Sequence, residues 1–304
     1  MKVYDCFTFY NEFELLELRL KALWDVVDYF VIVEADKKHT NEPKPFYFAE
    51  RQDDFREFFS KIRHVPVEMK VPFKGVGDWS IENAQRNAIM YGLGDAQPDD
   101  LIMISDLDEI PAPHVLQHLD EIPLMAPAVI PMSIANKGVF FPAQLLIPAS
   151  NFLEFGPIVI AQEFFYYYFD NVAKGFWNGT VISKRKNLTM PQEFRNTRGI
   201  FPCINGGGYH FSYMGGIDRV INKMTSIVDG NEMVVRSGGK LIDRKHVKKA
   251  MAQGKDIYAR KGPRMESQFY PYDAHNIKLP HIDEFLRKYP HFLREPKKYF
   301  KENF

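Results

Sequence analysis

Three carboxylates packed into four positions, Asp106, Asp108 and Glu109, are the residues of this chain best suited to chemistry. They follow the apolar run Leu101–Ile104, which is typical of a strand buried on both faces, so they fall at its carboxyl end, where open α/β sheets hold ligands. Because residues alternate sides along a strand, we expect Asp106 and Asp108 to point the same way. Two carboxylates on one side favour a cation between them, and oxygen ligands of this kind suit Mg²⁺ or Mn²⁺.

A helix N-terminus is the alternative interpretation of the same residues. In that case the carboxylates cap the next helix and Pro111 opens it. An isolated Asp-x-Asp would favour this second interpretation, whereas the buried strand ahead of it favours a ligand site. Both interpretations stay open from these residues alone.

The elements that must position these carboxylates alternate between strand and helix patterns. Strands are predicted at residues 3–9, 29–33, 64–67 and 101–104, and helices at 12–24, 51–61 and 79–92. The helix at 12–24 shows apolar residues at three- and four-residue spacing, with a cap near Asn11. Four strands separated by helices predict an α/β fold with a parallel, doubly wound sheet and right-handed crossovers.

The second half of the chain has a different composition. Residues 129–182 are crowded with Phe, Tyr and Pro, which favours mixed strands, and a basic helix is predicted at 245–253. Most of the aromatic side chains are expected in the core, although one or two could line a groove for a sugar acceptor. The composition changes near residue 125, between residues 1–125 and 126–304. No linker sequence marks this point, so one continuous domain is predicted.

The charge balance limits the partners. Lysine plus arginine and aspartate plus glutamate number 39 each, so no overall basic field attracts nucleic acid, and a phosphate-bearing ligand must be met by local groups. The first residues lack a long apolar core, and no stretch approaches the roughly 18 to 20 apolar residues that cross a bilayer. Cys6 and Cys203 are the two cysteines, predicted as reduced thiols. We therefore expect a cytoplasmic protein without a transmembrane segment.

Five segments follow one another over roughly residues 1 to 235: VYDCFTFYNEFELLELRL, VDYFVIVEA, PKPFYF, ENAQRNAI followed by DLIMISDLDEIP, and GGGYHFSYMGG. Their order resembles glycosyltransferase family 17, which includes the enzyme that adds the bisecting N-acetylglucosamine to N-glycans. The resemblance implies a GT-A fold, with residues 1–125 as the nucleotide-sugar-binding half and 126–304 as the acceptor side. It also implies a UDP-sugar donor, UDP-N-acetylglucosamine first, a glycan or other hydroxyl acceptor, a divalent metal and inversion at the anomeric carbon.

Metal binding is assigned to three residues on this basis. Asp108 is predicted to ligate Mn²⁺ or Mg²⁺ directly, and Asp106 to bind it through water or to bind the ribose. The resemblance implies His210 as a further ligand, since a neutral imidazole suits Mn²⁺, although a histidine between aromatic residues could equally be packed in the core. The glycines at 206–208 allow a close backbone approach there. Glu109 is expected to orient this shell or to touch the donor sugar.

Donor recognition is predicted at the ends of the first two strands. Asn11 and Glu34 fall there, and the Glu34 carboxylate could accept hydrogen bonds from uracil or the ribose. Arg86 could grip a phosphate or hold Asp106 in place, and Lys44 could play a similar part; a surface arginine is the alternative for Arg86. No Gly-x-Gly-x-x-Gly or P-loop pattern follows the first strand, which argues against dinucleotide and ATP sites.

Inversion requires a general base on the acceptor hydroxyl. The candidates are the downstream carboxylates Glu163, Asp170, Asp218, Asp229 and Glu232. We favour Asp229 or Glu232 as the catalytic residue, because they follow the His210 segment closely and are predicted in a polar loop.

Two other functions remain open from the sequence. A haloacid-dehalogenase-type (HAD-like) phosphatase also uses Asp-x-Asp after a strand, although Ile110 stands here where threonine or valine is usual and three β/α units come first. The other is a non-catalytic module that binds a sugar nucleotide without turnover.

Overall fold

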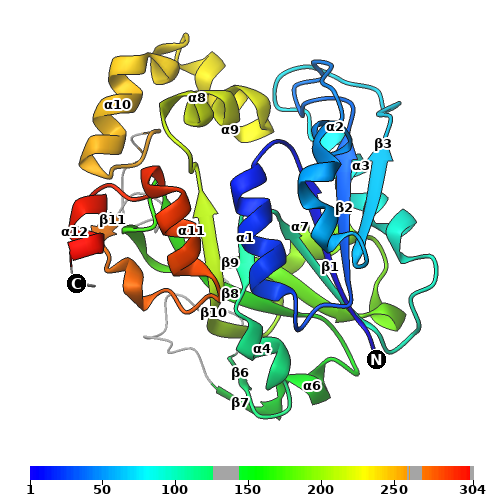
Figure 1. The fold of residues 1–304 in the computed structure, drawn as a ribbon. Helices are drawn as coiled ribbons and strands as arrows, with labels where there is room; N and C mark the ends of the chain where they lie inside the picture. Colours follow the sequence, from blue (N-terminus) through cyan, green and yellow to red (C-terminus); the bar gives the residue numbers. More distant parts are fainter. Residues whose placement is uncertain (126–143, 259, 261–268, 302–304) are drawn as a thin grey trace, which may run out of the picture.

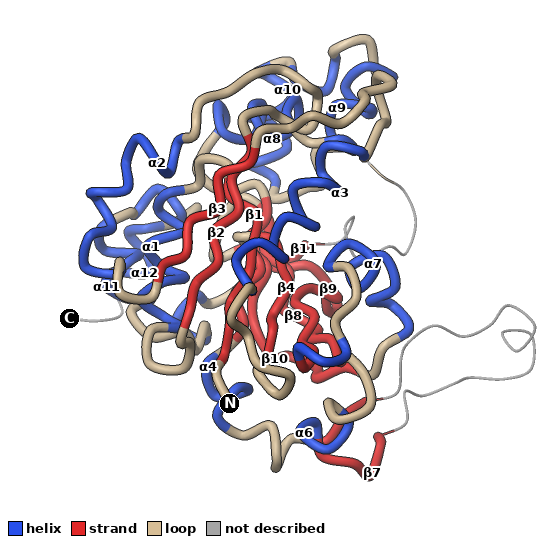
Figure 2. Tube along the Cα trace, turned by 90° about the vertical axis from the view of Figure 1, so that its right-hand side faces the viewer, coloured by secondary structure: helices blue, strands red, loops and turns tan. Residues whose placement is uncertain are grey.

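The computed structural model describes residues 1–125, 144–258, 260 and 269–301. A single sheet of eleven strands runs through them in the order β3-β2-β1-β4-β9-β8-β10-β6-β7, with β11 added to β9 and β5 to β10. Figure 1 shows α1 and α11 in front of this sheet and α7 behind it, and the turned view in Figure 2 places α3 and α7 together on the second face. The α/β class predicted from the sequence, with a GT-A-like arrangement, is confirmed.

Four parallel strands form the N-terminal part of the sheet. They are β1 (Val3–Phe9), β2 (Tyr29–Ala35), β3 (Ile62–Val67) and β4 (Leu101–Asp106). β1 pairs with β2 on one side and with β4 on the other, and β2 pairs with β3. All four predicted strands are confirmed. Their carboxyl ends point toward the top of Figure 1, where α8 and α9 also lie.

The helices between these strands differ in detail from the prediction. The helix expected at 12–24 is α1 (Phe13–Leu23), whose N-cap is Glu12 rather than Asn11 and makes no capping hydrogen bond through its side chain. The segment expected at 51–61 is a short α2 (Tyr47–Arg51) followed by the 3-10 helix η1 (Gln52–Phe58). The helix expected at 79–92 divides into α3 (Ser80–Asn87) and the 3-10 helix η2 (Ala88–Leu93).

The remaining strands join both halves of the chain in one sheet. Antiparallel β9 (Asn171–Lys184) pairs with β4, and β8 (Ile158–Tyr166) lies between β9 and β10 (Cys203–Ser212). The mixed strands predicted for the aromatic-rich region are therefore found from residue 144 onward, while its first part, up to residue 143, lies outside the described residues. The predicted basic helix is α10 (Arg244–Gln253).

Short elements complete the described chain. The strands are β5 (Glu109–Pro111), β6 (Pro123–Met125), β7 (Gln144–Pro148) and β11 (Phe269–Pro271). The α-helices are α4 (Pro113–Gln117), α6 (Ala149–Phe152), α7 (Pro191–Thr197), α8 (Ile217–Ser226), α9 (Val228–Arg236), α11 (Ile282–Lys288) and α12 (Pro296–Lys301). The 3-10 helices are η3 (Arg185–Asn187), η4 (Arg198–Ile200), η5 (Lys240–Ile242), η7 (Ala274–Asn276) and η8 (Pro290–Phe292).

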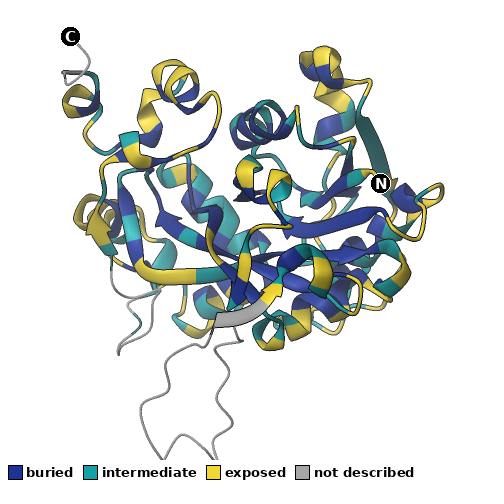
Figure 3. Ribbon diagram, turned by 90° about the horizontal axis from the view of Figure 1, so that it is seen from below, coloured by how far each residue is buried: buried dark blue, intermediate teal, exposed yellow. Residues whose placement is uncertain are grey.

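The core fills both faces of the sheet. One apolar cluster joins the strands to α1 and α11, and a second packs β1, β2 and β4 against η2 and α7. Figure 3 shows the central strands buried and the outer faces of the helices exposed. Cys6 and Cys203 are both free and buried, as predicted. Within the described ranges, every helix is too short or too polar to cross a bilayer.

Candidate active site

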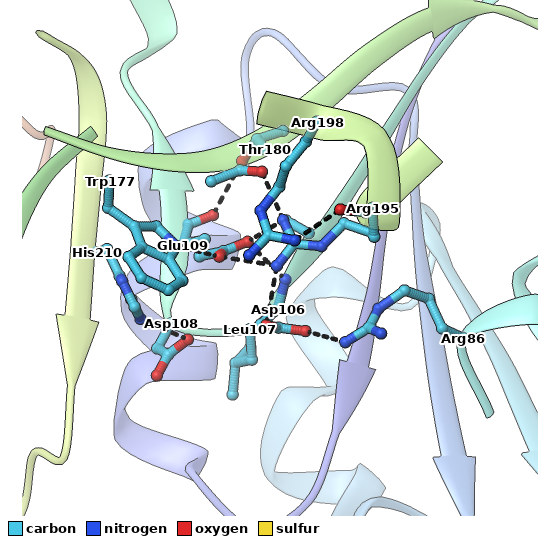
Figure 4. A network of polar contacts seen from close by, with 12 residues as sticks. Arg86, Asp106, Leu107, Asp108, Glu109, Trp177, Thr180, Arg195, Arg198 and His210 are labelled. Atoms are coloured by element: carbon cyan, nitrogen blue, oxygen red, sulfur yellow. Dashed lines mark hydrogen bonds and ion pairs between the residues drawn. The ribbon is translucent and has the colours of Figure 1, made fainter. Parts of the chain in front are cut away.

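The acidic segment forms a tight connection between two strands. β4 ends at Asp106, residues 107 and 108 form a turn, and Glu109 begins β5. The alternative of a helix N-terminus is wrong, because a strand follows and α4 begins only at Pro113. The turn also separates Asp106 and Asp108, so strand alternation does not apply to them and each carboxylate meets its own partners (Figure 4).

A buried arginine of α1 holds this turn. Arg19 is fully buried and donates two hydrogen bonds to Asp5 at 2.6 and 2.7 Å. It also donates to the backbone carbonyls of residues 106, 107 and 109 at 3.1, 3.0 and 2.8 Å. Arg19 was not predicted as a site residue. The available signal was its position on the apolar stripe of the helix, three residues after Leu16, where an unpaired charge would be costly.

Two further arginines grip Asp106. Arg86 of α3 donates to Oδ1 at 2.7 Å, and Arg195 of α7 donates to Oδ2 at 3.0 Å. Burial by itself would raise the pKa of Asp106, but the two guanidinium groups outweigh it and hold the pKa well below its usual range. Arg86 therefore occupies one of its two predicted positions, the one that holds Asp106 in place. Arg195 was not singled out from the sequence.

Glu109 is fully buried behind the turn. Its carboxylate accepts hydrogen bonds from both terminal nitrogens of Arg195 at 2.8 and 2.9 Å, from Trp177 Nε1 at 2.8 Å and from the Asp106 backbone N–H at 2.9 Å. Glu109 was predicted either to touch the donor sugar or to orient the acidic turn, and its burial rules out the first role. Orientation of the acidic turn is the role that this placement fits.

Asp108 faces a lysine and a histidine. Lys223 of α8 donates to Oδ2 at 2.6 Å, and His210 Nε2 lies 3.5 Å from Oδ1. Burial would raise the pKa of Asp108, but Lys223 and then His210 outweigh it and the pKa is lowered. His210 is on β10 rather than in a loop, and its ring stacks on Phe164 with the centroids 4.8 Å apart.

A glycine beside His210 allows this approach. A Cβ atom on Gly208 would lie 2.5 Å from the carbonyl oxygen of Ile110, so only glycine lets β10 pair with β5 this closely. The pairing sets His210 opposite Glu109 in register. The glycine run thus positions the histidine against the acidic turn.

The three predicted metal ligands do not form a preassembled cluster. Among the residues that the structure describes, no three His, Cys, Asp or Glu side chains gather closely enough to hold an ion by themselves. Both oxygens of Asp106 are taken by arginines. Asp108 and His210 do fit a divalent ion, since a carboxylate oxygen and an imidazole nitrogen 3.5 Å apart on one cavity wall can share it, with ligand oxygens completing the shell.

A cavity of about 840 Å³ opens above the acidic turn. Its described wall carries eight lysine and arginine residues against five aspartates and glutamates, in a chain whose total charge balances. The basic residues are Lys37, Lys38, Lys44, Arg86, Arg195, Arg198, Lys223 and Arg260, and the acidic ones are Glu12, Glu82, Asp106, Asp108 and Asp229. Aromatic side chains, among them Trp177 and Tyr213, complete the wall. Such a cavity suits an anionic ligand that also carries rings.

The predicted donor-binding residues separate into two groups. Lys44 lines the cavity, and burial lowers its pKa. Glu34 is fully buried and is not on the cavity wall: it accepts from the Phe48 backbone N–H at 2.9 Å and lies 3.1 Å from His64 Nε2. The prediction that Glu34 contacts the nucleoside is wrong. The chain after β2 folds over the end of that strand, and the Glu34 carboxylate is hydrogen-bonded there instead of facing the cavity. Asn11 lines a small adjacent pocket and not the cavity.

Among the five candidate bases, Asp229 alone lines the cavity. It begins α9, not a loop, and burial, then Glu82 and Glu232, raise its pKa. Glu232 is one turn further along and pairs with Arg236, away from the cavity wall. The other three carboxylates interact with groups outside the cavity wall. Glu163 accepts a hydrogen bond from Tyr272, Asp170 accepts from the backbone N–H groups of residues 294 and 295, and Asp218 forms an ion pair with Arg244.

The fold and the site together define an α/β protein of GT-A-like architecture, with an acidic turn at the end of a central strand beneath a basic cavity. The family model of glycosyltransferase family 17 matches residues 1–136. This part of the chain is therefore similar to glycosyltransferase family 17. The resemblance noted in the sequence is confirmed over these residues, and the segment around His210 lies beyond the match.

Curated relatives match a shorter stretch of the chain than the family model does. Over 108 residues the chain is 32% identical to beta-1,4-mannosyl-glycoprotein 4-beta-N-acetylglucosaminyltransferase from Homo sapiens, and equally so to the proteins of that name from Rattus norvegicus and Mus musculus. The matched stretch is 34% of this chain and 20% of each relative. The chain thus spans about a fifth of the length of the curated relatives it matches.

Proposed function

We propose that this protein is a metal-dependent, inverting glycosyltransferase that moves N-acetylglucosamine from UDP-N-acetylglucosamine to a hydroxyl group of a glycan. The observation that carries the proposal is the basic cavity above the acidic turn, within a chain that matches glycosyltransferase family 17. The names of the relatives support N-acetylglucosamine as the transferred sugar.

The cationic wall suits a nucleoside diphosphate leaving group. Lys223, Arg198 and Arg260 bring positive charge to the same cavity as Asp108. Fixed charges of this kind stabilise the negative charge that develops on a departing diphosphate, because they need no reorganisation during the reaction. Because Glu34 is buried away from the cavity, we assign nucleoside recognition to cavity residues 8–10, at the carboxyl end of β1, and 37–39, which follow β2.

Asp108 and His210 would hold the divalent ion. When bound there, the ion supplies further neutralisation of the diphosphate oxygens as the bond to the sugar breaks. Asp106 acts differently in this proposal: it keeps Arg86 and Arg195 charged and fixed beside the turn. Glu109 in turn fixes Arg195 and Trp177 from below.

Asp229 is the proposed general base. Its carboxylate accepts the proton of the acceptor hydroxyl while that oxygen attacks the anomeric carbon, so no covalent intermediate forms on the protein. The raised pKa of Asp229 makes it a stronger base than an ordinary aspartate. The acid limb of kcat/KM should accordingly lie above the ordinary aspartate value of about 3.9.

Asp229→Asn should lower kcat by about 10²- to 10⁴-fold, the usual contribution of a positioned general base. Glu232→Gln is the matched comparison, since this carboxylate lies in the same helix, pairs with Arg236 and is not part of the cavity wall. Steady-state rates of UDP release, measured with each variant, distinguish the two carboxylates. A large loss in Glu232→Gln with normal turnover in Asp229→Asn would reverse the assignment.

UDP-sugars should stabilise the protein more than GDP- or CMP-sugars, with UDP-N-acetylglucosamine giving the largest rise in Tm in the presence of Mn²⁺. The reason is that a ligand bound by the native state alone raises the melting temperature, and at equal concentration the tighter ligand raises it more. A thermal-shift ranking at equal concentrations checks this prediction. A clear preference for GDP-sugars would contradict it.

The two alternatives make different predictions in the same assay. A phosphatase of the haloacid dehalogenase type needs the first aspartate free to attack phosphorus, whereas both oxygens of Asp106 accept from arginines. Release of phosphate from simple phosphomonoesters would nevertheless favour it. Tight binding of UDP-N-acetylglucosamine without UDP release, across a panel of glycan acceptors, would favour a non-catalytic binding module.

A further inference from the structure

Lys223 joins α8 to the acidic turn through a hydrogen bond to Asp108. Lys223 Nζ lies 2.6 Å from Asp108 Oδ2, and both residues line the cavity. His210 Nε2 faces the other oxygen of the same carboxylate at 3.5 Å. The lysine therefore occupies one side of the carboxylate to which an ion must bind in the proposed function.

The ammonium group of Lys223 and a divalent ion would repel each other if both stayed in contact with the Asp108 carboxylate. A divalent ion next to Asp108 repels the ammonium group of Lys223, because like charges a few ångströms apart interact strongly in a partly buried site. The diphosphate brings negative charge to the same cavity and attracts that ammonium group. The two effects act in the same direction and draw Lys223 from Asp108 toward the ligand.

Lys223 is better placed to move than the arginines near it. Arg86 donates to Asp106, Glu82 and Gln192, and Arg195 to Asp106, Glu109 and a backbone carbonyl; both side chains are almost fully buried. In the described part of the chain, the hydrogen bonds of Lys223 Nζ go to Asp108 alone, and its side chain is 24% exposed. Lysine also has a flexible four-carbon stem. Lys223 Nζ also lies 5.3 Å from the centre of the Tyr213 ring, so moving this charge costs one hydrogen bond and that ring contact.

We propose that Lys223 is a diphosphate-binding residue that neutralises Asp108 until the donor arrives and then hydrogen-bonds an oxygen of the donor diphosphate. This inference rests on the proposed function and adds a specific residue to it. Lys223 has two successive partners, Asp108 in the free protein and the diphosphate in the complex. The lysine keeps the carboxylate neutralised in the absence of ligand and leaves it available to the ion when the donor binds.

The exchange predicts opposite effects on two binding constants. Without the lysine charge, Asp108 lacks its resident cation, so Mn²⁺ should bind the free protein more tightly. Without the same charge, the diphosphate loses a hydrogen-bonding partner, so UDP should bind more weakly at saturating Mn²⁺. A lysine that merely supported the fold would lower stability and would leave both binding constants unchanged.

The test compares Lys223→Met with the wild-type protein by two titrations. Mn²⁺ binding is followed by the electron paramagnetic resonance signal of the free ion, and UDP binding by calorimetry at saturating Mn²⁺. We expect the Mn²⁺ Kd to fall and the UDP Kd to rise, each by about tenfold, which is the effect expected of one charged hydrogen bond. Lys223→Gln should behave like Lys223→Met, and Lys223→Arg should restore part of the UDP affinity.

A matched control is Lys248→Met, the same change at an exposed position of the nearby helix α10. It should alter neither constant. Unchanged Mn²⁺ and UDP affinities in both Lys223→Met and Lys223→Gln, with normal circular dichroism, would overturn the exchange while leaving the proposed function intact. A wild-type protein that binds neither Mn²⁺ nor UDP would instead contradict the proposed function, and the exchange with it.

Discussion

Replacing Arg19 with methionine should lower the free energy of unfolding by about 3–5 kcal/mol, the cost of removing one partner of a buried ion pair. Arg19 and Asp5 are both fully buried, so the change leaves an uncompensated carboxylate inside the protein. It also leaves the backbone carbonyls of residues 106, 107 and 109 without their shared donor. Methionine fills a similar volume, so the loss is polar rather than steric. Urea unfolding measures the effect.

Two comparisons identify the cause of this loss. Arg56→Met removes an arginine whose pair with Asp53 is exposed, and should leave stability unchanged. Combining Arg19→Met with Asp5→Leu removes both buried charges and should recover part of the stability, the remaining loss reflecting the carbonyls of the turn. If Arg19→Met lost less than about 1 kcal/mol, the buried pair would not be what holds the acidic turn.

The strands could be predicted because parallel strands buried on both faces are continuous apolar runs. The predicted strand at 3–9 has the same bounds as β1, and the run at 101–104 needed only two more residues to match β4. The helix predicted at 51–61 was less successful. Its apolar spacing is compatible with both helix types, and tertiary packing of Phe55 and Phe58 accompanies a 3-10 conformation there.

The location of the site could be predicted, but the partners within it could not. A carboxylate after a buried strand marks the functional edge of the sheet from local sequence alone. Arg195 and Lys223 reach Asp106 and Asp108 across 89 and 115 positions, and no local pattern in α7 or α8 identifies them. The same edge rule was wrong for Glu34, because the backbone of Phe48 and the ring of His64 cover that strand end.

Each carboxylate of the acidic turn is matched by basic side chains of the protein itself. Asp106 meets two arginines, Asp108 meets a lysine and a histidine, and Glu109 meets Arg195. Carboxylates this close would otherwise repel one another and raise their pKa values. The basic partners instead lower the pKa of both Asp106 and Asp108, so both carboxylates remain ionised beside one another.

Asp108→Asn should reduce transfer by about 10³-fold or more, a loss of roughly 4 kcal/mol of transition-state stabilisation. Asparagine keeps the shape of the side chain but removes the charge that would hold the ion and Lys223. The fold should survive, because Asp108 lies on the cavity wall and not in an apolar cluster. Rates of UDP release, together with the melting temperature, measure both effects.

Asp218→Asn provides the control for this change, since Asp218 is an exposed aspartate that pairs with Arg244 on the surface. It should leave turnover and melting temperature unchanged. Asp106→Asn should behave differently from both, because it weakens the hold on Arg86 and Arg195 and should lower stability together with activity. An Asp108→Asn protein that kept near-normal turnover at limiting Mn²⁺ would mean that Asp108 does not bind the ion. The cationic wall formed by Arg198, Lys223 and Arg260 would then have to neutralise the diphosphate by itself.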